Sequence, residues 1–118
     1  MPKQIDNRYI IIAAIIIVTA ILYVPVYQFE FHNFDDIIYV AENQHIHSGV
    51  SIDNLRWAFS FKDKQNTYWH PVTWLSHMLD CQLFGLKAGW HHLHNLILHV
   101  CNAVLLFLFL NQTTGSLW

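Results

Sequence analysis

Two long runs of apolar residues constrain the fold of this chain more than any other feature of its sequence. They cover residues 9–29 and 93–110, and each is close to the ~20 apolar residues that a helix needs to cross a bilayer. Only 12% of the 118 residues are charged, about half of the share that is usual in soluble domains. The sequence therefore predicts an all-α membrane protein with two transmembrane helices, at residues 9–28 and 91–110.

The residues that flank the first run predict the orientation of the chain. Lys3 and Arg8 precede it, and basic residues usually stay in the cytoplasm. The run is longer than the core of a signal peptide and has no small-x-small cleavage pattern, so we expect a retained anchor. Residues 1–8 are then cytoplasmic, residues 29–90 form an extracytoplasmic loop, and residues 111–118 are the cytoplasmic end of an expected fragment of a longer protein.

Short amphipathic helices are expected in the loop. Asn33 or Asp35 can cap a first helix and Ser51 a second. Residues 71–85 predict a third, because a proline near the start and a glycine just past the end are typical of helices. The expected apolar faces of the second and third helices consist of Ile52, Leu55, Phe59, Val72, Leu75, Met78, Leu79 and Leu83. Residues 62–67 form a polar connection.

The net charge, the cysteines and the one sequon each argue against a particular partner or modification. The net charge of −2 offers no basic surface for nucleic acid, so no nucleic-acid partner is expected. A disulfide is not expected, because Cys101 lies inside the second apolar run and Cys81 lies before it. Asn111 begins a glycosylation sequon, but the predicted topology puts it in the cytoplasm, where it is a chance match.

Charged residues of the loop are the first candidates for chemistry. Asp35 and Asp36 follow the first predicted membrane helix at a short distance. Adjacent carboxylates there can take a proton from a hydroxyl group or hold a divalent cation. They can equally serve as a helix cap in a solvated turn. Arg56 can bind a phosphate outside the membrane or remain solvated, and the residues alone leave these alternatives open.

A polar stripe crosses the second predicted membrane helix. Its members recur at steps of three, four and three residues: His92, Asn95, His99 and Asn102. This spacing puts them on one face of a helix. Polar groups at such positions line a wet cavity, which often marks function, or join neighbouring helices. His91 and His94 lie off the stripe, and we expect them to be plain interfacial residues.

The nine histidines raise the question of a metal. A zinc site needs three or four converging ligands, whereas His91, His92 and His94 cannot all point the same way on one helix. We therefore assign no metal ligand among them, and haem is not expected because the first apolar run contains no histidine. His77 and Asp80 are one helical turn apart and are expected to form a structural ion pair.

The motifs and their order resemble a known family. Residues 31–37 read Phe-His-Asn-Phe-Asp-Asp-Ile, residues 69–73 read Trp-His-Pro-Val-Thr, and residues 91–99 read His-His-Leu-His-Asn-Leu-Ile-Leu-His. With Gly85 between them, they resemble the N-terminal region of the transmembrane, tetratricopeptide-repeat-containing O-mannosyltransferases and their bacterial relatives. These enzymes are membrane glycosyltransferases of the C superfamily, and the resemblance covers residues 29–118.

This resemblance implies transfer of a sugar from a polyprenyl phosphate to an acceptor hydroxyl, a protein Ser or Thr in the animal members. The reaction would take place outside the cytoplasm, at a bacterial inner membrane or in the endoplasmic reticulum. Asp35 would be the general base, and Asp36 would orient the acceptor or assist. The residues assigned to the lipid-phosphate cavity are His92, Asn95, His99 and Arg56. The family's further spans and repeats do not occur in these 118 residues, so the chain alone is expected to be inactive.

The expected partners are the lipid bilayer, a polyprenyl-phosphate-linked sugar donor and an acceptor protein. No cofactor is expected beyond a divalent cation that Asp35 and Asp36 can hold. Two other functions stay open. The chain can be a small two-span membrane protein that binds a partner through the polar stripe, or a histidine-based metal binder.

Overall fold

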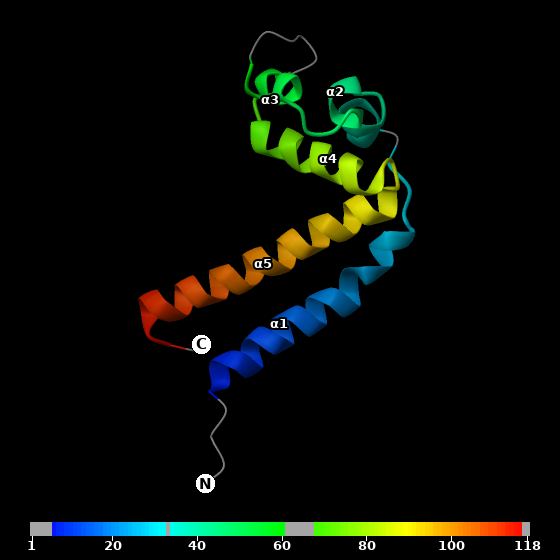
Figure 1. Cartoon of the computed structure of the whole chain (residues 1–118). Coiled ribbons are helices and arrows are strands. Elements are labelled where there is room, and N and C mark those ends of the chain that lie inside the picture. The colour runs from blue at the N-terminus through cyan, green and yellow to red at the C-terminus, as the bar shows by residue number, and fades with distance from the viewer. Residues whose placement is uncertain (1–5, 33, 61–67, 117–118) are drawn as a thin grey trace. The chain divides into compact units, whose positions relative to one another are not determined.

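The computed structural model describes residues 6–32, 34–60 and 68–116, and within these ranges it contains helices and no strand (Figure 1). The all-α prediction is therefore confirmed. The chain divides into two compact units. Unit 1 is formed by Met1–Tyr27 and His92–Trp118, and unit 2 by Gln28–His91. Three predictions fall outside the described residues: the role of Lys3, the cap at Asn33 and the polar connection at residues 62–67.

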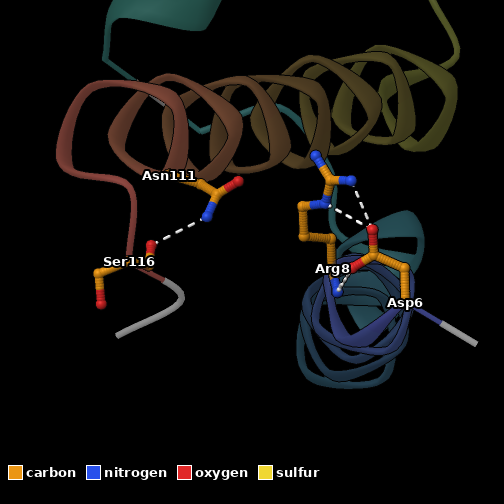
Figure 2. Close-up of polar contacts among 4 residues, drawn as sticks. All are labelled: Asp6, Arg8, Asn111 and Ser116. Atoms are coloured by element: carbon orange, nitrogen blue, oxygen red, sulfur yellow. Dashed lines mark hydrogen bonds and ion pairs between the residues drawn. The ribbon is translucent and has the colours of Figure 1, made fainter.

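Helix α1 (Asn7–Tyr23) begins at a well-formed N-cap. The Asp6 carboxylate accepts a hydrogen bond from the backbone N–H of Arg8 at 3.0 Å and pairs with the guanidinium of the same residue (Figure 2). At its other end the α-helix changes into the 3₁₀-helix η1 (Val24–Gln28). Pro25 explains the change, because proline has no N–H to continue the α-helical bonding. The chain thus passes Pro25 in a tighter helical turn.

Helix α5 (Ala88–Thr114) is the longest element and begins three residues before the predicted span. The helix ends at Gly115, whose φ of +67° is one that glycine adopts readily. Near this end the side chain of Asn111 donates a hydrogen bond to the Ser116 carbonyl at 2.9 Å (Figure 2). The hydroxyl groups of Thr113 and Thr114 bond to carbonyls of the preceding turn.

Two helical segments, Asn7–Gln28 and Ala88–Thr114, are long and apolar enough to cross a membrane. At 1.5 Å per residue, the 27 residues of α5 extend about 40 Å, beyond the roughly 30 Å of a hydrocarbon core. None of the residues of α1 is buried. A helix that presents apolar side chains on all sides fits surroundings of lipid or of other membrane helices better than water.

Unit 2 has a small core of its own. Its helical elements are the π-helical turn η2 (Ile37–Ala41), α2 (Gln44–His47), α3 (Ile52–Phe59) and α4 (Pro71–Phe84). Helices α2 and α3 both lie against α4 (Figure 1). The core is a cluster of buried apolar side chains: Val40, Ile46, Trp57, Ala58, Trp74, Met78 and Cys81. Trp57 and Trp74 have ring centroids 5.4 Å apart, so α3 and α4 meet through two large aromatic surfaces.

The predicted bounds of the second and third loop helices hold, but their predicted apolar faces are mostly not the buried ones. Ser51 caps α3, since its side chain accepts a hydrogen bond from the Asn54 N–H at 3.1 Å, and α4 runs from Pro71 to the turn at Gly85 as expected. The members of the predicted apolar faces that are exposed are Ile52, Phe59, Val72, Leu79 and Leu83. Leu55 and Leu75 are half-buried, and only Met78 is fully buried. The faces that carry Trp57 and Trp74 turn inward instead, because each tryptophan covers more apolar surface than the aliphatic side chains it displaces.

A buried amide ties α2 to α3. Asn54 is 5% exposed, and its Nδ2 donates to Ser48 Oγ at 2.8 Å and to the Gly49 carbonyl at 2.7 Å. Its Oδ1 lies 3.0 Å from His45 Nδ1, so the imidazole donates to it. The His45 ring in turn stacks on Trp57 with centroids 4.5 Å apart. One side chain thus satisfies three polar groups at the edge of the aromatic core.

Candidate functional site

Asp35 and Asp36 stand at the start of the helical turn that continues as η2. The carboxylate of Asp36 accepts a hydrogen bond from the backbone N–H of His32 at 2.9 Å and is half-buried. Asp35 is exposed. The two carboxylates therefore differ: that of Asp36 holds the chain before η2 in place, and that of Asp35 is accessible to a second molecule.

The polar stripe of α5 lines a cavity in unit 1. Its volume is about 270 Å³. The lining residues are Tyr23, Val26, His92, Asn95, Leu96 and His99. The Tyr23 ring meets the His99 ring edge-on, with centroids 5.7 Å apart. Three of the four stripe residues thus share one cavity, whereas Asn102 is exposed one turn further along α5 and does not line it.

Arg56 lies on α3 in unit 2, and its guanidinium is 3.6 Å from the Asp53 carboxylate, one turn earlier on the same helix. Both side chains are largely exposed. An exposed pair of this kind contributes little to stability and leaves most of the guanidinium donors to solvent.

The predicted site residues belong to both units. The cavity residues His92, Asn95 and His99 belong to unit 1, and Asp35, Asp36 and Arg56 to unit 2.

A second polar cluster, which the sequence analysis missed, lies inside unit 2. His77 and Asp80 of α4 and His91 of α5 each offer a ligand atom, and these atoms all lie within 4.8 Å of one another. Asp80 and His91 are both 2% exposed. His91 is therefore not the plain interfacial residue that was predicted. The helix break at Gly85 folds the first turn of α5 back toward α4, and a histidine soon after such a break was the signal available in the sequence.

Two imidazole nitrogens of this cluster have no hydrogen-bond partner in the structure. His91 Nε2 lies 2.8 Å from the Gly85 carbonyl oxygen, and His91 Nδ1 is 3.8 Å from Asp80 Oδ2, too far for a hydrogen bond. Nδ1 of His91 and Nδ1 of His77 are both buried without a hydrogen-bond partner. Asp80, whose predicted ion-pair partner was His77, thus also faces His91 of the next helix.

Burial tunes two titratable side chains of α4. It lowers the pKa of His77, an effect that the nearby His91 reinforces and the carboxylates of Asp80 and Asp36 oppose. His77 is therefore held toward its neutral form. Burial, followed by the charge of Asp80, raises the pKa of Cys81 to about 11, so this thiol stays protonated at physiological pH. Cys81 and Cys101 are both free cysteines, as the sequence predicted.

The arrangement supports two kinds of chemistry: binding of a polar group at the stripe cavity of unit 1, and binding of a cation or sharing of a proton at the cluster of unit 2.

Comparisons of this chain with models of protein families, with curated proteins and with solved structures find no match.

Proposed function

We propose that this chain is the N-terminal part of a membrane glycosyltransferase that uses a polyprenyl-phosphate-linked sugar. The acceptor is a hydroxyl group outside the cytoplasm, with protein Ser or Thr as the leading candidate. The proposal builds on the resemblance of the ordered motifs. The observation that carries it further is the convergence of His92, Asn95 and His99 on one cavity next to Tyr23 and Val26.

The composition of this cavity suits a lipid phosphate. Imidazole and amide N–H groups donate hydrogen bonds to phosphate oxygens, and hydrogen bonds to a charged group are the stronger kind. Val26 and Leu96 supply apolar walls that suit the prenyl chain. Polar side chains within a membrane helix raise the free energy of insertion unless they contact a partner or a substrate. Binding of the lipid phosphate would offset this cost for the polar stripe.

In the proposed reaction, the acceptor oxygen attacks the anomeric carbon of the sugar. The bond between that carbon and the phosphate oxygen breaks, and the polyprenyl phosphate leaves with the bonding electron pair. The proton of the acceptor hydroxyl passes to Asp35, the more accessible of the two carboxylates. Asp36, already bonded to the His32 N–H, assists by holding the start of the helical turn that carries Asp35. General-base catalysis of this kind typically contributes about 10²–10⁴-fold to the rate.

Donor binding and transfer test the two parts of the proposal separately. Purified chain in lipid nanodiscs should bind a polyprenyl-phosphate sugar, and His99→Ala should weaken binding about tenfold or more because a hydrogen bond to a charged oxygen is lost. Asn102→Ala is the matched control on the same helix face and should bind as the wild type does. Equal affinity in all three proteins would refute the assignment of the cavity.

Transfer is measured with radiolabelled donors, in membranes that hold this chain and in membranes that hold a full-length relative. In the relative, changing the aspartate that corresponds to Asp35 into asparagine should lower the transfer rate at least about 100-fold, while donor binding persists. Asp35 leaves the mechanism if that variant keeps its transfer rate.

A second candidate function is partner binding through the polar stripe. Asn95, His99 and Asn102 are exposed on α5, and in a membrane such groups favour contact with a neighbouring helix. This function predicts stable oligomers or hetero-complexes that Asn102→Ala disrupts as strongly as His99→Ala does. Cross-linking in nanodiscs with and without the sugar donor distinguishes the two functions.

A further inference from the structure

The cluster of His77, Asp80 and His91 in unit 2 is a group of buried polar side chains that the proposed function does not use. Two imidazole rings and one carboxylate meet there, with one ligand atom of each residue within 4.8 Å of the others. Asp80 and His91 are almost completely buried. Each is a side chain that proteins seldom bury without a specific partner.

The hydrogen bond of His91 fixes the chemistry of its other ring nitrogen. A carbonyl oxygen can only accept, so the contact of 2.8 Å with the Gly85 carbonyl requires His91 Nε2 to carry the proton. In the neutral ring Nδ1 then holds a lone pair, and this atom is buried without a hydrogen-bond partner. It faces the Asp80 carboxylate at 3.8 Å. A lone pair and a carboxylate repel each other unless a positive charge lies between them.

His77 brings a second imidazole ring to the same place. Its Nδ1 is also buried without a hydrogen-bond partner, and its ring lies 6.3 Å from that of His91, centroid to centroid, with the two planes 24° apart. A neutral imidazole is the form that binds a metal ion. Asp36 acts on His77 as a further negative charge, which also favours a cation in this part of unit 2.

We propose that His77, Asp80 and His91 bind a divalent transition-metal ion of the zinc class. Imidazole nitrogen and carboxylate oxygen are common zinc ligands at ~2.0–2.2 Å, and three protein ligands leave a fourth position for water or another molecule. Ligand atoms around such an ion lie roughly 3.4 Å apart, so the three side chains close in by an ångström or so on binding. Mg²⁺ and Ca²⁺ are disfavoured because they select oxygen ligands.

Hydrogen bonding to the protein supports the geometry of the site. Metal-bound histidines usually donate their second ring N–H to a carbonyl or carboxylate, which fixes the tautomer and the ring orientation. The Gly85 carbonyl does this for His91. Gly85 itself has a φ of +64°, a conformation suited to glycine, so the turn between α4 and α5 positions this carbonyl.

Zinc titration of the purified chain tests the proposal. Chain in detergent is stripped with a chelator and titrated with Zn²⁺ against a chromophoric competitor. We expect one tightly bound Zn²⁺ per chain and no comparable binding of Mg²⁺. Asp80→Asn and His77→Gln should each weaken Zn²⁺ binding at least about 100-fold, since even groups outside the ligand set typically cost 10–100-fold. The matched control is His47→Gln, an exposed histidine of α2, which should bind as the wild type does.

A measurement on the unaltered protein guards against variants that do not fold. In ¹⁵N-labelled chain, long-range imidazole spectra report each ring nitrogen. Zn²⁺ should shift one ring nitrogen of His77 and Nδ1 of His91, while Nε2 of His91 keeps its proton. The alternative is an imidazolium–carboxylate pair of His91 and Asp80, in which Nδ1 of His91 is protonated and does not respond to Zn²⁺. That result, or equal affinity in the His47 and Asp80 variants, would overturn the metal site.

Discussion

Replacing Asn54 with alanine should destabilise unit 2 by about 3 kcal/mol. The change removes two hydrogen bonds donated by Nδ2, to Ser48 Oγ and the Gly49 carbonyl, and one accepted by Oδ1 from His45. Each such bond contributes about 0.5–1.5 kcal/mol net, and more where the abandoned partner remains buried. Since 1.4 kcal/mol corresponds to about a factor of ten, the ratio of folded to unfolded protein should fall more than a hundredfold.

Urea unfolding in detergent, followed by tryptophan fluorescence, measures this loss. Trp57 is a suitable reporter because the His45 ring stacks on it and Asn54 holds His45 in place. The matched control is Gln44→Ala, which removes an exposed amide from α2 and should change the unfolding free energy by less than about 0.5 kcal/mol. If Asn54→Ala fell within that same range, the buried amide would not be what joins α2 to α3.

Two further predictions concern unit 2. Gly49→Ala should cost about 1 kcal/mol more than Gly85→Ala in urea unfolding, because both glycines have positive φ but an added Cβ meets Gln82 at 3.2 Å only at Gly49; equal costs would contradict this crowding. In a variant without the other cysteine, Cys81 should react with a maleimide roughly 100-fold more slowly in the folded than in the unfolded chain below pH 9, because its pKa rises from 9.0 to about 11 and lowers the thiolate fraction. The folded state keeps this proton longer, so its stability should fall between pH 9 and pH 11; an unchanged reaction rate on unfolding would refute the shift.

The long elements of the fold could be predicted from the sequence because their signals are local. A run of some twenty apolar residues specifies a helix whatever surrounds it, and Pro71 and Gly85 mark the bounds of α4 through their own backbone preferences. The inward faces of α3 and α4 could not be read in the same way. Helical spacing identified apolar faces that include Ile52 and Val72, but it did not say which face is buried. The contact between Trp57 and Trp74 decides the packing, and such a contact depends on tertiary structure.

The candidate sites show the same division. The spacing of His92, Asn95 and His99 along one helix correctly predicted that they share a face, and they share a cavity. The cluster in unit 2 depends on the turn at Gly85, which brings His91 to Asp80 and His77. No periodicity within one helix contains that information. The angle between two successive helices is set by the backbone of the turn and by the packing around it.

The unequal polarity of α1 and α5 has a consequence for biosynthesis. Translocon insertion favours a helix in proportion to its aliphatic content and penalises polar side chains near its centre. Helix α1, rich in isoleucine and without a histidine or a buried position, would partition into lipid unaided as soon as it is made. Helix α5 carries His99 and Asn102 in its middle turns and would enter less readily. Its insertion would then wait for an earlier helix to shelter these groups, so the order of synthesis would also be the order of assembly.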